Sequence, residues 1–221
     1  MDYNQTFNFM NSKYISLGND CTIAMILAHL NKKQATLPLD WVVCKDFETC
    51  INLIDSRFKY FIDDPEIICE VKDAIKGFLS KGWLEFCKGN FDDNKFVNSY
   101  INKKIPITYV HDFKKEIPFD ENYLIVKKKY IRRIERFYNI LKEKGNLINF
   151  IFYYPDLNNE SLHKFENILS NINPDLNYKF HIITHNRNIN TKFNCYYINK
   201  KMDRIYTLNC DKNLISFIKD I

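Results

Sequence analysis

Cys21 is the side chain with the clearest potential for chemistry. It follows the turn Gly18-Asn19-Asp20 and precedes an apolar helical pattern that runs to about Leu30. This spacing predicts a cysteine at a helix N-terminus, where unpaired N–H groups and the helix dipole favour a thiolate and can stabilise an oxyanion. The carboxylate of Asp20 opposes that effect, because a nearby negative charge disfavours a thiolate. Cysteine also serves as a small buried hydrophobe, so position alone leaves a packing role open.

A thiol nucleophile needs a base, and imidazole is the usual one. His111 follows the apolar run Ile107–Val110, which predicts a strand that ends at His111 and delivers its ring to the sheet edge. His185 follows a second predicted strand, Tyr178–Thr184, and is the rival base. In a purely structural role, His111 would be half-buried and bonded to the backbone.

A third group should orient the imidazole. Asp112 is adjacent to His111, but neighbours in a strand point to opposite faces, so Asp112 can serve only if the strand ends at His111. Asp40 and Asp120 are the other options, and the sequence does not choose among the three.

Basic side chains follow the His111 segment on a strongly periodic helix, at Arg132, Arg133 and Arg136. They can clamp an anionic group bidentately, although a basic stripe is more often a solvated helix face. The chain has no Walker loop, no GxGxxG and no GxSxG. Its aromatic residues fall at core spacing, so we expect no nucleic-acid partner.

The elements that must position these groups alternate along the chain. We expect strands at 14–17, 107–110, 147–154 and 178–184, with a hairpin of 194–199 and 204–209. We expect a first helix from Cys21 or Thr22 to Leu30, a second that begins after a cap at Asp46, and a third from near Pro65 to Gly82. Three more helices are expected: one between the turn region 116–122 and Gly145, one at 160–172 and one at 214–221. The strand–helix–strand order favours a parallel pair with a right-handed crossover. The predicted fold is α/β: a single domain over residues 1–221, with a central mostly parallel sheet, flanking helices, a more helical N-terminal half and a C-terminal hairpin.

Composition narrows the class of protein. Residues of the hydrophobic set make up 46% of the chain and aromatic residues 15%, which is ample for a sizeable core. The net charge of +5 is spread over the chain and does not indicate a nucleic-acid-binding face. The seven cysteines show neither CxxC nor zinc-site spacing, so we expect no metal, no cofactor and reduced thiols in a cytoplasmic setting. The chain shows no signal-peptide pattern, and no segment approaches the roughly 18 apolar residues that cross a bilayer, so we expect no membrane partner.

Four ordered blocks together resemble a known family. They are Tyr14-Ile15-Ser16-Leu17-Gly18-Asn19-Asp20-Cys21, Leu37-Pro38-Leu39-Asp40-Trp41-Val42, Val110-His111-Asp112-Phe113 and Tyr130-Ile131-Arg132-Arg133-Ile134-Glu135-Arg136-Phe137. Their order and spacing are similar to the putative papain-like cysteine peptidase family, a domain of unknown function found in bacteria and large DNA viruses. The recurring blocks of that family are an SLGxxC turn, a PFDW loop, an HD strand end and an RRixRf helix. The resemblance spans roughly residues 14–154.

The resemblance implies that Cys21 is the nucleophile and His111 the base, with Asp112 beside it in the same block. It also marks Asp40, Trp41, Asp112, Arg132 and Arg133 as positions that belong to the family's blocks. We expect the substrate-binding residues to be Asn19, Asp40, Trp41, Arg132 and Arg133. Leu39 departs from the family, which usually has an aromatic residue there, so a pocket wall would differ. The family's activity is itself inferred from the order of its cysteine and histidine.

Two kinds of function follow from these residues. The first is a thiol hydrolase that acts on a peptide, isopeptide or other acyl bond. The alternative is a non-catalytic module that uses the same cleft for an anionic or sugar-like ligand, or that binds a host protein if the source is viral. A viral source would make the setting the host cytoplasm. The sequence does not specify the substrate or the oligomeric state.

Overall fold

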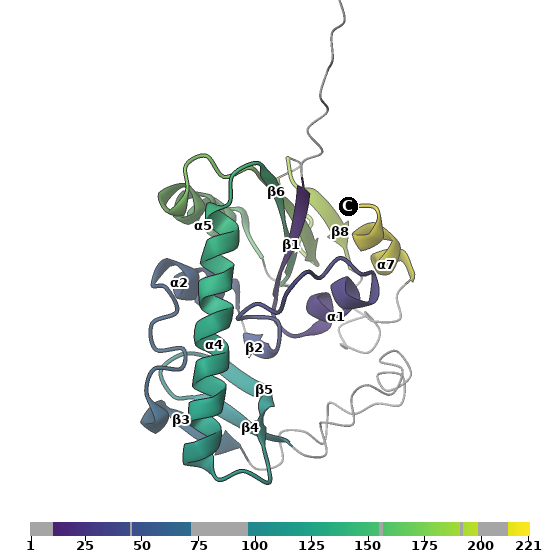
Figure 1. Ribbon diagram of the computed structural model, residues 1–221. Coiled ribbons are helices and arrows are strands. Elements are labelled where there is room, and N and C mark those ends of the chain that lie inside the picture. The colour runs from purple at the N-terminus through teal and green to yellow at the C-terminus, as the bar shows by residue number, and fades with distance from the viewer. Residues whose placement is uncertain (1–10, 45, 72–96, 155–156, 191, 199–211) are drawn as a thin grey trace, which may run out of the picture.

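A four-stranded parallel sheet, sheet A, forms one half of the molecule. The computed structural model describes residues 11–44, 46–71, 97–154, 157–190, 192–198 and 212–221. Sheet A has the strand order β1 (Asn11–Gly18), β6 (Asn146–Tyr153), β7 (Tyr178–Thr184) and β8 (Asn194–Tyr197), and all its pairs are parallel (Figure 1). The carboxyl ends of β1, β6 and β7 therefore lie at one edge of the sheet, where α/β proteins commonly place their functional groups.

Helices cover both faces of sheet A, because side chains alternate along each strand. On one face, Phe150 and Phe152 of β6 pack against Phe165 of α5 (Asn159–Ile172). The helix α2 (Phe47–Asp55) lies on the same face. On the other face, α1 (Thr22–His29) and α7 (Lys212–Lys219) share a buried cluster with Ile151 and Tyr153.

A second sheet, sheet B, is antiparallel and was not expected. Its strand order is β2 (Val42–Cys44), β5 (Ile107–Lys114), β4 (Val97–Asn102) and β3 (Ile68–Val71). A short 3-10 helix, η1 (Pro65–Ile67), leads into β3. One cluster of buried side chains runs from Phe150 in sheet A to Tyr109 in sheet B, so the two sheets share a core.

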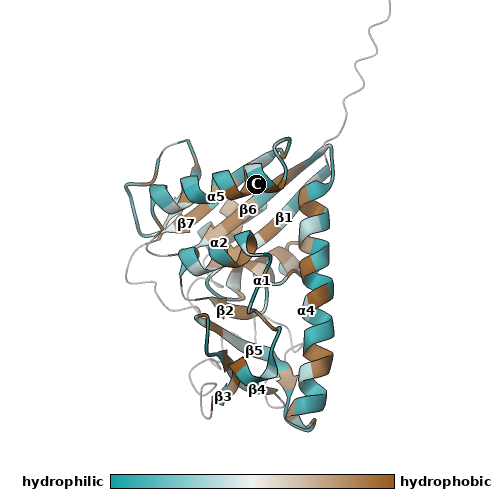
Figure 2. Ribbon diagram, turned by 90° about the vertical axis from the view of Figure 1, so that its left-hand side faces the viewer, coloured by the Kyte–Doolittle hydropathy of each residue, from teal (hydrophilic) through white to brown (hydrophobic). Residues whose placement is uncertain are grey.

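The helix α4 (Phe119–Lys142) spans both sheets. At about 1.5 Å per residue its 24 residues extend about 36 Å. Figure 2 shows it along one side of the molecule, from sheet A to sheet B, with hydrophobic and hydrophilic positions interleaved. Its apolar stripe includes Val126, Tyr130, Phe137 and Leu141, all fully or almost fully buried. The sheets are thus tied to one long rigid element.

Most of the predicted elements are confirmed with small shifts at their ends. The structure shows the strands expected at 14–17, 147–154 and 178–184, and the helices expected after Cys21, after Asp46, at 160–172 and at 214–221. Asp46 caps α2 as predicted, since its carboxylate accepts the Thr49 N–H at 2.7 Å. The predicted parallel pair is also present, as β6 and β7. None of the helices in the described ranges combines the length and apolarity that a bilayer span needs.

Three local predictions are wrong. The helix expected from Pro65 stops after η1, and Ile68–Val71 pairs with β4 as a strand, in keeping with its β-branched residues. The rest of the expected helix, residues 72–82, lies outside the described residues. The helix α4 begins at Phe119, within the region expected to be a turn. The strand β5 does not end at His111 but continues to Lys114.

The distribution of helices along the chain and the expected C-terminal hairpin are the two larger features of the prediction. Among the described residues the two longest helices, α4 and α5, lie in the C-terminal half, whereas residues 72–96 of the N-terminal half lie outside the described residues. The first arm of the expected C-terminal hairpin is β8, which pairs in parallel with β7. The second arm, 204–209, lies outside the described residues.

Candidate active site

Cys21 lies where the chain passes from β1 into α1. The strand ends at Gly18, and Asn19 donates its N–H to the Tyr153 carbonyl at 3.0 Å. Cys21 is the N-cap residue of α1, and its carbonyl accepts the Met25 N–H at 3.0 Å. A Cβ at Gly18 would lie 3.1 Å from the Asp20 carbonyl oxygen, closer than most Cβ contacts, so this turn favours glycine. The predicted placement of Cys21 at a helix start is confirmed.

Asp20 takes one of the N–H groups that this helix start was expected to leave open. Its Oδ1 accepts the Thr22 N–H at 2.7 Å, and the residue is only 3% exposed. Burial raises the pKa of the Asp20 carboxyl, and the bond from Thr22 offsets only part of that effect. The N–H of Thr22 is therefore occupied in this structure, which narrows the set of donors that an oxyanion can use.

Two polar atoms near Cys21 are buried without a hydrogen-bond partner. Within the described part of the chain they are Ser16 Oγ and Asn19 Oδ1. Most buried polar groups in proteins are paired, and each exception costs free energy. The segment that leads into Cys21 therefore keeps two polar atoms that a ligand or a water molecule would satisfy.

A backbone hydrogen bond joins the Cys21 turn to sheet B. The Cys44 N–H donates to the Asn19 carbonyl at 2.8 Å. Cys44 is the last residue of β2, which pairs with β5 through Val42 and Tyr109. The turn that carries Cys21 and the strand that carries His111 are thus held to the same short strand.

A β-bulge lies at His111. The register of β4 against β5 passes from Asn98–Phe113 to Tyr100–Tyr109, so β5 advances four residues while β4 advances two. Bulges re-aim side chains and are common beside active sites. His111 is half-buried, and its ring meets the Trp41 ring edge-to-face, with centroids 5.5 Å apart at 80°.

The ring of Trp41 also contacts a lysine that belongs to an ion pair. The Lys33 ammonium lies 4.5 Å from the centroid of the Trp41 ring and 3.0 Å from Asp40 Oδ2. The same carboxylate oxygen accepts the Leu37 N–H at 2.7 Å. Asp40 is 2% exposed, and burial raises its pKa despite the cations of Lys33 and Arg133. Asp40 therefore pairs with the lysine that packs on the Trp41 ring.

The carboxylate of Asp112 is directed to α4. Its Oδ1 lies 2.9 Å from Lys129 Nζ and 3.5 Å from Arg133 Nη2, and its Oδ2 accepts a short hydrogen bond from the Tyr130 hydroxyl. Burial alone would raise the pKa of Asp112, but Arg133, Lys129 and Tyr130 hold it below its ordinary value. The predicted orienting role of Asp112 depended on a strand that ends at His111, and β5 does not end there.

The two predicted arginines differ in their surroundings. The side chain of Arg133 is 11% exposed, lies 4.8 Å over the Tyr130 ring and interacts with both Asp112 and Asp40. Its Nη1 is buried without a hydrogen-bond acceptor among the described residues. Arg132 is exposed on the solvent side of α4. The structure thus brings Arg133 together with Asp40 and Asp112, and leaves Arg132 at the surface.

The remaining candidates lie apart from these contacts. Asp120 is exposed in the first turn of α4. His185 directly follows β7, as predicted, and its Nδ1–H donates to the Ile198 carbonyl at 2.8 Å. Its position at the end of β7 keeps His185 as the rival base. No group of three or more metal-binding side chains occurs among the described residues.

Sequence reasoning missed three members of this network: Lys33, Lys129 and Tyr130. Lys129 is four residues before Arg133, and this spacing puts both cations on one helix face. That spacing is the local signal that the sequence offers for Lys129. Lys33 follows α1 without any local pattern that would identify it.

The fold and these contacts define a class: an α/β protein with a cysteine at the start of a helix and a histidine on a neighbouring sheet. Residues 12–188 match the model of a family described as "Putative papain-like cysteine peptidase", and the chain belongs to that family. It is also 28% identical over 138 residues to "Uncharacterized protein R408" of Acanthamoeba polyphaga mimivirus. That alignment covers 61% of this chain and 59% of the mimivirus protein, so the chain spans less than two thirds of its relative. No solved structure matches the chain.

Replacing Asp112 with asparagine tests the buried ion network. Because the folded pKa of Asp112 lies below its ordinary 3.8, its charge stabilises the fold above that pH, and this stability is lost as the pH falls through the folded pKa. We expect Asp112→Asn to lower the free energy of unfolding by about 3 kcal/mol at pH 7, with a smaller difference below pH 3.8. Urea unfolding at several pH values measures the loss of stability and its dependence on pH. The exposed control Asp120→Asn should change the free energy of unfolding by less than about 1 kcal/mol. Equal effects of the two variants would contradict the assignment of Asp112 to a buried ion network.

Replacing Asp20 with asparagine should change the free energy of unfolding in the opposite direction. Its raised folded pKa means that its contribution is complete below 3.8 and is lost as the pH rises through the folded pKa. Asp20→Asn keeps an acceptor for the Thr22 N–H and removes the buried charge. We expect it to raise the free energy of unfolding by about 1–3 kcal/mol at pH 7 and to have little effect in acid. A loss of stability at pH 7 would show that the charged carboxylate is well compensated.

Proposed function

We propose that this protein is a thiol hydrolase in which Cys21 is the nucleophile and His111 the base, acting on a peptide, isopeptide or other acyl bond. The observation that carries the proposal is the Asn19–Cys44 hydrogen bond of 2.8 Å, since it ties the Cys21 turn to the β2–β5 pair that bears Trp41 and His111. The family description supports the same chemistry.

The proposed reaction follows the usual order for a thiol nucleophile. His111 takes the Cys21 proton, and the thiolate attacks the carbonyl carbon to form a C–S bond and an oxyanion. The oxyanion collapses, the bond to the leaving group breaks, and the imidazolium of His111 protonates that group. Water then gives a proton to His111, attacks the acyl thioester and releases the acid and the Cys21 thiol.

Asn19 is our candidate for oxyanion binding. The Thr22 N–H already donates to Asp20, so the helix start alone supplies fewer donors than the sequence suggested. The amide of Asn19 lies two residues before Cys21, and its oxygen has no partner among the described residues. Its Nδ2 would supply a neutral donor of the kind that oxyanion holes use.

The other predicted residues receive different roles. We propose that Trp41 orients His111 in place of the carboxylate usual in such sites, through the edge-to-face contact of 5.5 Å. Asp40, Asp112 and Arg133 are positioning residues in this proposal, because all three side chains are largely buried in ion pairs. Arg132, which is exposed, remains the proposed contact for an anionic part of the substrate.

Alkylation of the native protein tests the nucleophile. Burial raises the pKa of the Cys44 thiol to about 12 and that of Cys50 well above its ordinary value, so both should stay protonated and inert. We expect iodoacetamide to modify Cys21 faster than the half-buried Cys69, as measured by mass spectrometry of peptides over time. Equal rates at the two cysteines would contradict the proposal.

Matched histidine variants identify the base. His111→Ala should slow alkylation of Cys21 at least about tenfold, while the rate at Cys69 stays unchanged and serves as an internal reference. His185→Ala should leave both rates unchanged. If only His185→Ala slows Cys21, then His185 is the base and the proposed pair is wrong.

A further inference from the structure

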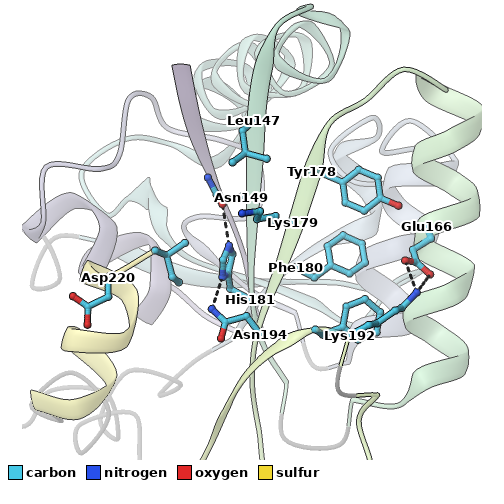
Figure 3. Close-up of a pocket in the computed structure, with 12 residues that line it drawn as sticks. Leu147, Asn149, Glu166, Tyr178, Lys179, Phe180, His181, Lys192, Asn194 and Asp220 are labelled. Atoms are coloured by element: carbon cyan, nitrogen blue, oxygen red, sulfur yellow. Dashed lines mark hydrogen bonds and ion pairs between the residues drawn. The ribbon is translucent and has the colours of Figure 1, made fainter. Parts of the chain in front are cut away.

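A cavity of about 500 Å³ opens far from Cys21, at the start of β7 (Figure 3). The Cys21 turn is bonded to Tyr153 at the carboxyl end of β6, whereas the cavity is lined by Asn149, four residues earlier. At about 3.3 Å per residue, these points on β6 are about 13 Å apart. The volume falls within the roughly 300–1,000 Å³ typical of small-molecule sites. None of the proposed catalytic residues lines it.

The cavity is lined from both faces of sheet A. Pairing of β7 with β8 begins at His181 and Asn194, and the segment just before it, Lys192 and Phe193, lines the cavity. Because side chains alternate along β7, Phe180 projects toward α5 and His181 toward α7. Figure 3 shows the polar chain of Asn149, His181 and Asn194 on one side and the rings of Tyr178 and Phe180 on the other.

The polar side of the cavity is an amide–imidazole–amide chain. His181 Nε2–H donates to Asn149 Oδ1 at 2.9 Å, and His181 Nδ1 accepts from Asn194 Nδ2 at 3.0 Å. Burial, followed by the charges of Lys179 and Lys32, lowers the pKa of His181 to about 4. The ring is therefore neutral at physiological pH, with its tautomer fixed by the two amides.

One donor of this chain is unused. Asn149 is 1% exposed, and its Nδ2 has no hydrogen-bond partner within the described residues. A buried amide group without an acceptor costs free energy, and a bound ligand that offers a hydroxyl or carbonyl oxygen would recover it.

The other side of the cavity is aromatic, and the charges around it cancel. The rings of Phe180 and Phe193 stack with centroids 5.5 Å apart at 24°. Lys192 lies 2.9 Å from Glu166 Oε1, and the remaining charged side chains of the lining are one lysine, Lys179, and one aspartate, Asp220. With His181 neutral, the formal charges of the lining side chains sum to zero, which favours a neutral ligand.

We propose that this cavity binds a neutral carbohydrate of one or two rings. Sugar hydroxyls both donate and accept, which suits neutral amides, and the C–H groups of a sugar ring carry the positive partial charge that packs against aromatic faces. The site is separate from the Cys21 site and does not depend on the proposed hydrolase activity.

The test is binding of neutral sugars to the full chain. Glucose, galactose, mannose, N-acetylglucosamine and their disaccharides are titrated by calorimetry and by saturation-transfer NMR, with glucuronate and glucosamine as charged counterparts. We expect at least one neutral sugar to bind saturably at millimolar concentration or below, and more tightly than the charged sugars. Absence of saturable binding by every neutral sugar, or preference for a charged one, would overturn the proposal.

Variants locate the binding. Asn149→Leu and Phe193→Ala should each weaken it about tenfold, whereas Phe193→Tyr, which keeps the aromatic face, and Cys21→Ser, at the distant site, should leave it unchanged. If Asn149→Leu does not fold, the comparison of Phe193→Ala with Phe193→Tyr still decides. Binding that survives both Asn149→Leu and Phe193→Ala, or that is lost in Cys21→Ser, would place the sugar outside this cavity. The Nδ2 group of Asn149 would then be hydrogen-bonded by water alone.

Discussion

Two buried carboxylates, Asp40 and Asp112, set the constraint on which the rest of the site depends. Each is almost fully excluded from water, and an unpaired buried charge is too costly for a fold to keep. Cations must therefore come from other elements: Lys33 from the segment after α1, and Lys129 and Arg133 from α4. Arg133 interacts with both carboxylates and so connects the Asp40 loop to β5. This requirement fixes the face of α4 that carries Lys129 and Arg133 toward Asp112 of β5.

The network gives the proposed chemistry a rigid base. Lys33, ion-paired with Asp40, packs on the indole of Trp41, and Trp41 in turn makes an edge-to-face contact with His111. The β-bulge in β5 presents His111 there, while the Asn19–Cys44 bond fixes the Cys21 turn to the same strand pair. Enzymes react faster when their reacting groups are already held in position. Packed and ion-paired neighbours would hold the imidazole of His111 in this way.

Much of sheet A and its helices could be predicted from sequence, because strands such as Tyr178–Thr184 and helices such as α5 have strong local periodicity. Sheet B could not. Its strands are short, β2 having only three residues, and their pairing is decided by partners distant in sequence. The position of Cys21 followed from the local turn and helix pattern. The roles of Asp40, Asp112 and Arg133 did not, since the same residue types suit a ligand-binding surface and a buried ion network, and only burial separates the two.

The most direct measurement is the difference in the free energy of unfolding between Arg133→Met and Arg132→Met. These adjacent residues of α4 lose the same charge, but Arg133 is ion-paired with the buried carboxylate of Asp112 and Arg132 faces solvent. If the network is the structural basis of the site, Arg133→Met should cost about 3 kcal/mol or more and Arg132→Met less than about 0.5 kcal/mol. Equal costs for the two variants would contradict that central claim.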